Sequence, residues 1–389
     1  MNIAVFFGGK NTEHDVSIIT GQLIINGLKE IGHTVYPVYI SKEGKWYISE
    51  KMDNVEFFKN PNLKLEGEVN LNLAQNLNGT VILKTGGLFN TKQYSIDLAF
   101  PALHGKNGED GTIQGLFELL NLPYVGCDVV ASAISMDKAL TKLFYQRYNF
   151  PTTKFIALNT TDWETQKDNV LTDIKTNLTW PVFVKPARLG SSIGMTKVKS
   201  EDDLEFAIEV ALHYDTKVLV EESVEDLMDI TVALLGNEDP IYSQIQESDY
   251  SKDFFSYEDK YLNEGGAQLG NAEKSIIIPA RLDEKTTKEI QEMAKEIYKL
   301  MGLSGTARVD FLYNKTYKKY YANEINTLPG TLYHHLWKKS GMQLGELLKT
   351  LVDLAIAKKN LENKLTFTFE STILKSANSN KLQLKGQNS

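Results

Sequence analysis

The sequence has one cysteine, Cys127, among its 389 residues. A single thiol excludes an intrachain disulfide framework and any metal site built from several cysteines. Because Cys127 lies among apolar residues in PYVGCD, we expect it to be a small residue of the core.

Long apolar runs and an excess of basic residues are also missing. No run approaches the roughly 18 apolar residues of a membrane-spanning helix, and the N-terminus MNIAVFFGGK lacks the basic region and long apolar core of a signal peptide. The net charge of −8 is opposite in sign to a nucleic-acid-binding surface. We therefore expect a cytoplasmic protein that binds neither membranes nor nucleic acids.

What the sequence does contain is the composition of a soluble globular chain, with 42% hydrophobic and 24% charged residues. Its length suits two or three domains. The chain opens with an apolar strand over residues 3–7, a Gly8-Gly9 turn, an amphipathic helix and a second strand over residues 35–40. This βαβ pattern predicts an open α/β domain, in which ligands bind beyond the carboxyl ends of the strands. The glycine spacing of dinucleotide-binding enzymes is absent, which argues against a dehydrogenase.

Two groups of polar residues follow strands of this predicted domain. Glu13 and Ser17 lie at the start of the helix, where they either cap it or face a ligand. A third strand, over residues 96–101, ends in the loop ALHGKNGEDG, which carries His104. Such a loop after a buried strand favours ligand binding, although a histidine such as His104, taken alone, is more often a hydrogen-bonded turn residue.

The middle of the chain contains a candidate phosphate site. A helix is predicted over residues 129–145, and an apolar strand then delivers Lys185 into the loop ARLGSSIGM. Backbone N–H groups and hydroxyls of a Gly-Ser loop can surround phosphate oxygens while the lysine adds a positive charge. The loop is not a Walker A sequence, and we interpret it as a lid over nucleotide phosphates.

A strand pair is predicted over residues 308–330, with its turn at residues 314–316. Side-chain alternation places Arg308 and Asp310 on one face of the first strand, and Glu324 and Asn326 on one face of the second. Two carboxylates and an amide are hard oxygen ligands that suit Mg²⁺. An ordinary solvent-exposed hairpin is the alternative.

The C-terminal third is predicted to end in helices and a polar tail. Apolar stripes predict helices over residues 283–301 and 343–357 that pack as core. Beyond residue 359 the composition turns polar, with a possible strand at residues 365–369, and we expect this tail to be exposed.

Seven motifs occur in an order that resembles the D-alanine–D-alanine ligases, which are ATP-grasp carboxylate–amine ligases. They are FFGGKNTEHDVS, ALHGKNGEDGTIQG, SMDKALTK, VKPARLGSSIGM, EDKYL, RVDF and NEINTLPG, and they span nearly the whole chain. The resemblance implies a three-domain α/β ATP-grasp architecture. The domains expected are residues 1–127, 128–220 and 221–358, followed by the tail 359–389.

The resemblance also implies roles for individual residues. Lys138 and Lys185 match lysines on the ATP phosphates, Glu221 and Val224 match the adenine contacts, and Asp229 stands near the ribose-binding position after an apparent one-residue insertion. Asp310, Glu324 and Asn326 match ligands of two Mg²⁺ ions, for which Mn²⁺ can substitute. Arg308 and the Gly330 N–H match groups that stabilise the acyl phosphate and the oxyanion.

The same resemblance implies a substrate site. Glu13 matches the acid that holds the first D-alanine, with Ser191 and Tyr261 completing a hydrogen-bonded trio, and His104 and Lys260 match residues near the two substrates. A tyrosine at position 261 goes with amino-acid acceptors and a histidine with D-lactate. The chain departs from the family pattern at His335, where a serine usually binds the acceptor carboxylate; a histidine there can donate a hydrogen bond and, when protonated, adds charge.

The function implied is ATP-dependent formation of D-alanyl-D-alanine through a D-alanyl phosphate, for peptidoglycan precursor synthesis, by a homodimer. D-Serine or D-lactate as acceptor is the alternative on the same fold. A nucleotide-binding module without turnover is a remote alternative, because Lys185, Arg308 and Glu324 are all present.

Overall fold

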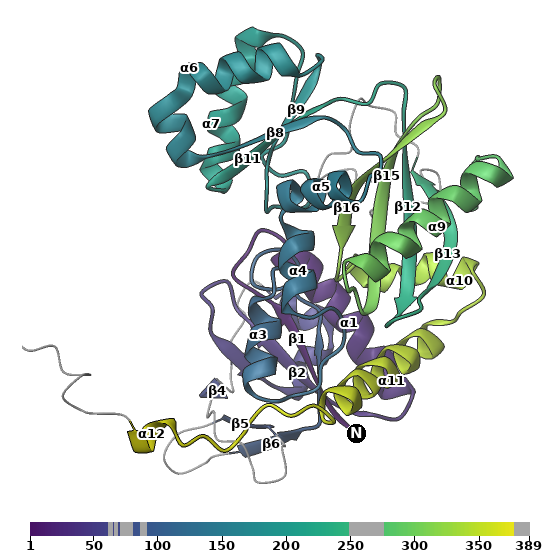
Figure 1. The fold of residues 1–389 in the computed structure, drawn as a ribbon. Coiled ribbons are helices and arrows are strands. Elements are labelled where there is room, and N and C mark those ends of the chain that lie inside the picture. The colour runs from purple at the N-terminus through teal and green to yellow at the C-terminus, as the bar shows by residue number, and fades with distance from the viewer. Residues whose placement is uncertain (61–64, 66–68, 71–80, 86–91, 249–275, 377–389) are drawn as a thin grey trace, which may run out of the picture.

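The computed structural model describes residues 1–60, 65, 69–70, 81–85, 92–248 and 276–376. Within these residues the strands form four sheets. Figure 1 shows them stacked along the molecule, with the N-terminal strands in the lower part, the five-stranded sheet at one side and a smaller sheet with α6 and α7 at the top.

The N-terminal sheet has the order β3-β2-β1-β7. Its strands β1 (Asn2–Gly8), β2 (Thr34–Ile40) and β7 (Leu98–Pro101) run parallel, and β3 (Trp46–Ile48) joins antiparallel at the edge. Helix α1 (His14–Glu30) connects β1 to β2, so the predicted βαβ unit is confirmed. The strands are apolar on both faces because separate hydrophobic clusters cover the two sides of the sheet.

Smaller elements surround this sheet. A second, antiparallel sheet has the order β4-β5-β6, and the helices α3 and α4 lie beside the parallel strands in Figure 1. The elements are η1 (Glu50–Asp53), α2 (Val55–Phe58), β4 (Val69–Asn70), β5 (Val81–Thr85), β6 (Lys92–Ile96), α3 (Thr112–Leu119) and α4 (Val129–Met136).

The prediction of a single helix over residues 129–145 is wrong, because two helices occupy this region. The chain leaves the helical conformation at Asp137 (φ −87°, ψ 100°), and α5 (Lys138–Arg147) begins there. The Asp137 carboxylate accepts hydrogen bonds from the N–H groups of Ala139 and Leu140, both at 3.1 Å. An aspartate satisfies the free N–H groups of a helix start well, and this cap places Lys138 at the first position of α5.

The small upper sheet has the antiparallel order β10-β9-β11-β8. Helices α6 and α7 pack on one face of it and bury a separate apolar cluster. The elements are β8 (Phe155–Asn159), α6 (Thr160–Asn177), β9 (Val182–Pro186), β10 (Thr196–Val198), η2 (Glu201–Asp203), α7 (Leu204–Tyr214) and β11 (Lys217–Glu222).

The five-stranded sheet has the order β14-β13-β12-β15-β16 and is antiparallel throughout. One face packs with helix α9 over an apolar cluster. The elements are β12 (Leu227–Gly236), β13 (Ile241–Ser248), β14 (Ile276–Ile277), α9 (Glu284–Leu300), β15 (Gly305–Asn314) and β16 (Lys319–Asn326). The predicted hairpin is confirmed, but its turn occupies residues 315–318 rather than 314–316.

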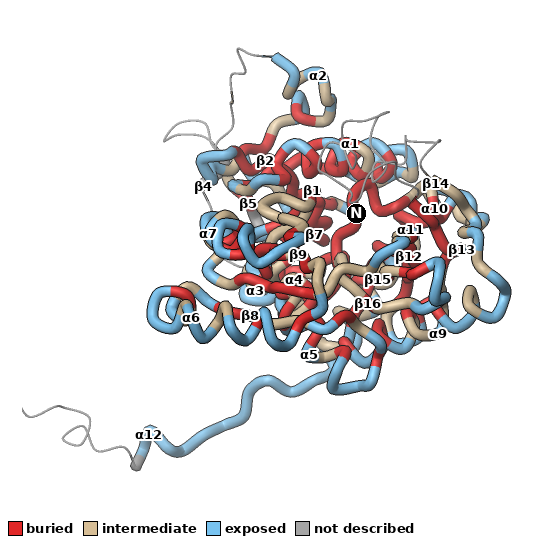
Figure 2. Tube along the Cα trace, turned by 90° about the horizontal axis from the view of Figure 1, so that it is seen from above, coloured by how far each residue is buried: buried red, intermediate tan, exposed pale blue. Residues whose placement is uncertain are grey.

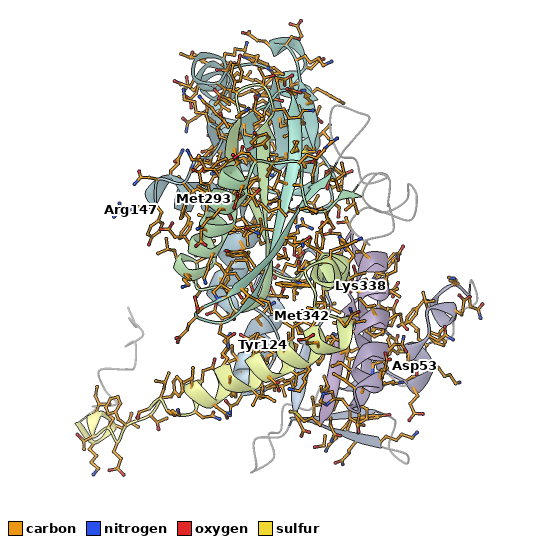
Figure 3. The ribbon with its side chains drawn as sticks, turned by 90° about the vertical axis from the view of Figure 1, so that its right-hand side faces the viewer. Asp53, Tyr124, Arg147, Met293, Lys338 and Met342 are labelled. Carbon is orange, nitrogen blue, oxygen red and sulfur yellow. The ribbon has the colours of Figure 1, made fainter. Side chains whose placement is uncertain are left out.

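The chain after the hairpin returns to the N-terminal unit. It forms η5 (Gly330–Tyr333), α10 (His334–Lys339) and α11 (Leu344–Glu362), and α11 extends five residues beyond its predicted end. Leu347, Leu348 and Leu351 of α11 share a core with α1. Figure 3 shows Tyr124 beside α11, and the Lys358 Nζ lies 5.0 Å from the centroid of the Tyr124 ring.

The tail is exposed over residues 363–375, as predicted, but the strand predicted at residues 365–369 is wrong. Leu365, Phe367 and Phe369 are all exposed, and the next element is the short helix α12 (Ile373–Ser376). Figure 2 shows this segment as a pale blue extension leaving the red interior. The alternation of apolar residues forms no strand here because no neighbouring strand among the described residues pairs with it. Across the residues described, no helix combines the length and the apolarity that a membrane crossing demands.

Candidate active site

A large cavity lies between the upper sheet and the five-stranded sheet. Its walls include Lys138 and Lys185 from one side and Arg308, Asp310 and Glu324 from the other. The two lysines come from α5 and β9, whereas Arg308, Asp310 and Glu324 come from β15 and β16. The fold therefore brings together on one cavity the lysines and the carboxylates that the sequence analysis assigned to separate sites.

The floor of the cavity is set by the register of the central strands. Strand β15 lies between β16 and β12. Asp310 on β15 is paired with Glu324 on β16 and with Thr231 on β12. Directly paired residues project to the same face of a sheet. The Thr231 Oγ1 donates a hydrogen bond of 2.8 Å to the Asp310 Oδ1, which fixes the orientation of that carboxylate.

Arg308 lines both this cavity and a smaller one next to it. Its Nε and Nη2 donate to the Asp310 Oδ2 at 3.0 and 2.6 Å. Its Nη1 is buried and, among the described residues, has no hydrogen-bond partner. Because a buried donor without a partner is costly, this N–H is suited to an oxygen of a bound substrate.

The carboxylates fit a hard divalent cation. Asp310 and Glu324 offer oxygen ligands, and Asn326 lines the smaller cavity at the end of the same strand. The Asn326 Oδ1 already accepts a hydrogen bond from the Leu328 N–H at 2.9 Å, but a carbonyl oxygen retains a second lone pair. Clusters of three or more His, Cys, Asp or Glu side chains arranged for a metal do not occur in the described part of the chain. Mg²⁺ would accordingly share these ligands with water and substrate phosphates, as is common for that ion.

Glu221 forms a buried ion-pair cluster at the other end of the cavity. Its carboxylate contacts the Nζ atoms of Lys185 and of Lys142, the latter at 2.7 Å, and it accepts a hydrogen bond of 2.9 Å from the Thr153 hydroxyl. Burial alone would raise the pKa of Glu221, but the two ammonium groups lower it well below its usual range. Glu221 therefore stays ionised in an interior position.

Other predicted nucleotide residues also lie at this cavity. Val224 and Asp229 both line it, beyond the end of β11 and near the start of β12. The Lys138 Nζ donates to the Leu189 carbonyl at 2.8 Å, and it lies 3.7 Å from the Glu324 Oε2. Lys138 thus connects the Gly-Ser loop to the sheet face that carries Glu324.

Glu13 and Ser191 meet at the smaller cavity, although they are far apart in sequence. The Ser191 Oγ donates a hydrogen bond to Glu13. Glu13 occupies the N-cap position of α1, but its side chain makes no capping hydrogen bond, so capping by the Glu13 side chain is wrong. Ser17 instead bridges β1 and the loop after β7, because its Oγ accepts from the Gly8 N–H and donates to the Ala102 carbonyl.

Glu109 joins Glu13 in the wall of the smaller cavity. Burial, reinforced by the negative charge of Glu13, raises the pKa of Glu109 to about 8. The Gly105 N–H donates to its carboxyl group at 2.6 Å. At neutral pH Glu13 therefore supplies the negative charge and the largely protonated Glu109 a further oxygen, an arrangement that suits the ammonium group of an amino acid.

The two predicted substrate histidines lie behind the cavity walls. The His104 Nε2 is 2.8 Å from the Thr20 Oγ1, and that hydroxyl accepts from the Thr331 N–H at 3.0 Å. The His335 Nε2 is 2.7 Å from the Gln246 Oε1. Neither histidine is among the described residues that line the two cavities.

Burial lowers the pKa of His104 and of His335 to about 4. The suggestion that His335 adds positive charge therefore does not fit its environment at neutral pH. Gly330 is buried at the start of η5. Lys260 and Tyr261 lie outside the described residues, so their predicted roles stay predictions.

Several residues of the site were not predicted. Lys142 occurs in SMDKALTK four residues after Lys138, one helical turn away, which is a signal that could have identified it. Glu109 is part of the predicted ligand loop. Thr231 had no signal in the sequence, because its place opposite Asp310 depends on a strand register set by distant residues.

Two antiparallel sheets that close on one cavity, with lysines on one side and carboxylates on the other, define the ATP-grasp class of enzymes. The comparisons with known proteins specify the family. A family model described as "D-ala D-ala ligase N-terminus" matches residues 2–127, and one described as "D-ala D-ala ligase C-terminus" matches residues 144–353. The chain belongs to the D-alanine–D-alanine ligase family.

Individual relatives agree with this assignment. A D-alanine–D-alanine ligase of Caldicellulosiruptor bescii is 37% identical over 384 residues, covering 95% of this chain and 99% of the relative. The solved D-alanine–D-alanine ligase of Coxiella burnetii is 30% identical with a TM-score of 0.76, covering 94% of this chain and 96% of its own. The solved D-Ala:D-Ser ligase VanG of Enterococcus faecalis is 34% identical with a TM-score of 0.75, covering 91% and 99%.

Proposed function

We propose that this chain joins two D-alanines into D-alanyl-D-alanine and converts ATP to ADP and phosphate. The observation that carries the proposal is the convergence of Lys138, Lys185, Arg308, Asp310 and Glu324 on one cavity, next to a smaller cavity walled by Glu13 and Glu109. The larger cavity supplies a phosphate and metal site, and the smaller one supplies a site for an ammonium group.

In the first step a carboxylate oxygen of the first D-alanine bonds to the γ-phosphorus of ATP. The bond from that phosphorus to the bridging oxygen of ADP breaks, which leaves D-alanyl phosphate and ADP. Lys138 and Lys185 hold the phosphates, and Glu13 with Ser191 holds the ammonium group of the substrate. Asp310, Glu324 and Asn326 would hold two Mg²⁺ ions, or Mn²⁺, which when bound neutralise phosphate charge.

In the second step the amine of the second D-alanine attacks the acyl carbon, loses a proton and expels phosphate. The negative charge that develops on the acyl oxygen needs donors already in place. The Nη1 of Arg308, which has no hydrogen-bond partner among the described residues, and the Gly330 N–H are assigned this role. Because water would hydrolyse D-alanyl phosphate, closure of the loops that carry Ser191 and Tyr261 serves to exclude it.

The remaining assignments complete the proposal. Glu221 and Val224 contact the adenine, Asp229 the ribose, and Lys260 and Tyr261 the second substrate. We assign the domains to residues 1–127, 128–220 and 221–358, with the tail at residues 359–389. The proposed enzyme acts as a cytoplasmic homodimer, which light scattering of the purified protein can test.

The proposal is tested by phosphate release from ATP with D-alanine, D-serine and D-lactate, each alone and in pairs, and with the products identified by mass. D-Alanine alone is expected to give the dipeptide with one phosphate released per product. D-Serine belongs in this panel because the solved relative VanG is a D-Ala:D-Ser ligase. ATP binding without substrate-dependent phosphate release would instead favour a nucleotide-binding module.

A further inference from the structure

The loop after Gly330 has an unusual backbone. Thr331, Leu332 and Tyr333 have φ values of 48°, 55° and 50°, so three consecutive residues with side chains adopt the left-handed conformation. Each such residue costs about 1–2 kcal/mol. Strain of this kind persists only where the surroundings enforce it, and it concentrates at functional sites. Here the Thr20 hydroxyl accepts from the Thr331 N–H, and Leu332 is buried in the core.

The consequence of this loop is that Tyr333 turns into the large cavity. Tyr333 is 2% exposed and is part of the cavity wall. The guanidinium carbon of Arg308 lies 4.9 Å from the centroid of its ring, close enough for a cation–π contact. The aromatic ring is therefore fixed beside the arginine whose buried Nη1 lacks a hydrogen-bond partner in the described part of the chain.

Gln246 lies at the same end of the cavity. It is directly opposite Thr231 on β12, and so it extends the row of Thr231, Asp310 and Glu324 to a fourth strand. Its side chain is 1% exposed, and buried amides require hydrogen-bond partners.

The hydrogen bonds of Gln246 have a consistent direction. Its Oε1 accepts from the His335 Nε2 at 2.7 Å, and its Nε2 donates to the Ser248 Oγ at 3.3 Å. The side chains of Arg308 and Gln246 lie close to the Tyr333 hydroxyl, where they oppose the rise that burial causes in its pKa. A phenol hydroxyl donates one hydrogen bond, and because Tyr333 is part of the cavity wall, its proton is available to a ligand there.

We propose that the Tyr333 hydroxyl donates a hydrogen bond to the carboxylate of the acceptor D-amino acid, with Gln246 and His335 as positioning residues behind it. This inference rests on the proposed function and deepens it. His335 occupies the sequence position at which family members carry a serine hydroxyl, but its ring lies behind Gln246. Tyr333, two residues earlier, takes over the donor role from inside the cavity wall.

The test compares D-alanine with D-alaninamide as acceptor, while D-alanine serves as donor. D-Alaninamide has no carboxylate, so it cannot be phosphorylated, and its product is distinguished by mass. In the Tyr333→Phe variant, kcat/KM for the D-alanine acceptor is expected to fall about tenfold or more, because a hydrogen bond to a charged group is lost. The value for D-alaninamide is expected to change less than about threefold, since a hydrogen bond to a neutral amide contributes less than one to a charged group.

Two positioning variants and one control complete the design. Gln246→Met and His335→Phe are expected to reduce the preference for D-alanine over D-alaninamide in the same direction, but less than Tyr333→Phe. Tyr313→Phe removes a hydroxyl from the opposite, apolar face of the sheet and is expected to leave the preference unchanged.

The preference is a ratio measured within each variant, so partial unfolding cannot imitate the effect. If Tyr333→Phe lowers kcat/KM for D-alanine and for D-alaninamide in parallel, or changes neither, the inference is wrong although the proposed function stands. If the wild-type protein forms no dipeptide at all, the proposed function itself fails.

Discussion

The two ends of the large cavity are built by different means. At the nucleotide end, Glu221 is held between the ammonium groups of Lys142 and Lys185. At the acceptor end, His335 and Gln246 share a directional hydrogen bond between groups without net charge, and the Tyr333 ring packs beside His335. One end relies on fixed charges and the other on the geometry of donors and acceptors.

This difference matches what each end has to recognise. ATP is a constant, highly charged substrate, and fixed charges bind it without fine discrimination. The acceptor must be distinguished from similar small acids, and a buried hydrogen-bonding site rejects an analogue that leaves its polar groups unpaired. This difference between the two ends leads to a prediction. Variants at the nucleotide end should change activity with every acceptor, whereas variants at the acceptor end should change the preference among acceptors.

The largest expected effect is at the metal-binding face between the two ends. Asp310→Asn removes one anionic ligand and the partner of Arg308, and we expect turnover at fixed MgATP to fall about 100-fold or more, because metal stabilisation is worth several kcal/mol. Asp226→Asn is the matched control, since Asp226 forms an exposed ion pair with Lys315. Near-normal turnover in Asp310→Asn would contradict the proposal that Asp310 is a metal ligand.

The next effect concerns the buried charges of the nucleotide end. Lys142→Met leaves Glu221 with only one of its two ammonium partners, and we expect the free energy of unfolding to fall by about 3 kcal/mol. The KM for ATP is expected to rise with every acceptor. Denaturant unfolding and steady-state kinetics measure the two quantities. Lys167→Met, which removes an exposed ion pair with Glu205, is the control; equal effects in both variants would contradict a special role for Lys142.

A smaller effect is expected in the choice of acceptor. If Tyr261 selects amino acids, Tyr261→His should raise depsipeptide formation with D-lactate relative to dipeptide formation. Product masses from a mixture of D-alanine and D-lactate give this ratio. Tyr257→His, four residues earlier, is the control, and an unchanged ratio in Tyr261→His counts against the role.

The smallest effect is a dependence of stability on pH. Burial lowers the pKa of His335 to about 4, whereas an unfolded histidine titrates near about 6.5. The unfolded chain therefore binds more protons than the folded chain between these values, so stability should be full above about pH 6.5 and fall as the pH drops toward 4.

The His335→Gln variant should show a smaller loss of melting temperature between pH 7 and pH 5 than the wild-type protein. The exposed His213→Gln variant should behave like the wild-type protein. Equal pH dependence in all three proteins would show that His335 is not held neutral by the fold.

The charged residues that line the cavity were largely predictable from the sequence. Side-chain alternation alone placed Arg308 and Asp310 on one face of a strand, and Lys185 could be recognised at the end of a strand before a Gly-Ser loop. These signals are local, because each depends on residues within one element and its adjoining loop. The helix break at Asp137 was also local in origin, but the continuous apolar pattern of residues 129–145 hid the cap.

The acceptor end was not predictable in the same way. Gln246, Tyr333 and His335 come from a strand, a 3-10 turn and a helix, and they meet through the register of β12 and β13 and three left-handed residues. Sequence alone pointed to His335 because of its position in the motif. The backbone of the loop instead places Tyr333 in the cavity wall. No local sequence pattern predicts this placement.

The central claim is that the donor carboxylate is phosphorylated before the peptide bond forms, and an isotope measurement tests it most directly. D-Alanine labelled with ¹⁸O in its carboxylate is incubated with unlabelled ATP, and the released phosphate is analysed by mass. Because the oxygen that bonds to the γ-phosphorus leaves with it, the account predicts one ¹⁸O atom in each phosphate released with dipeptide. Unlabelled phosphate accompanying dipeptide would contradict the account.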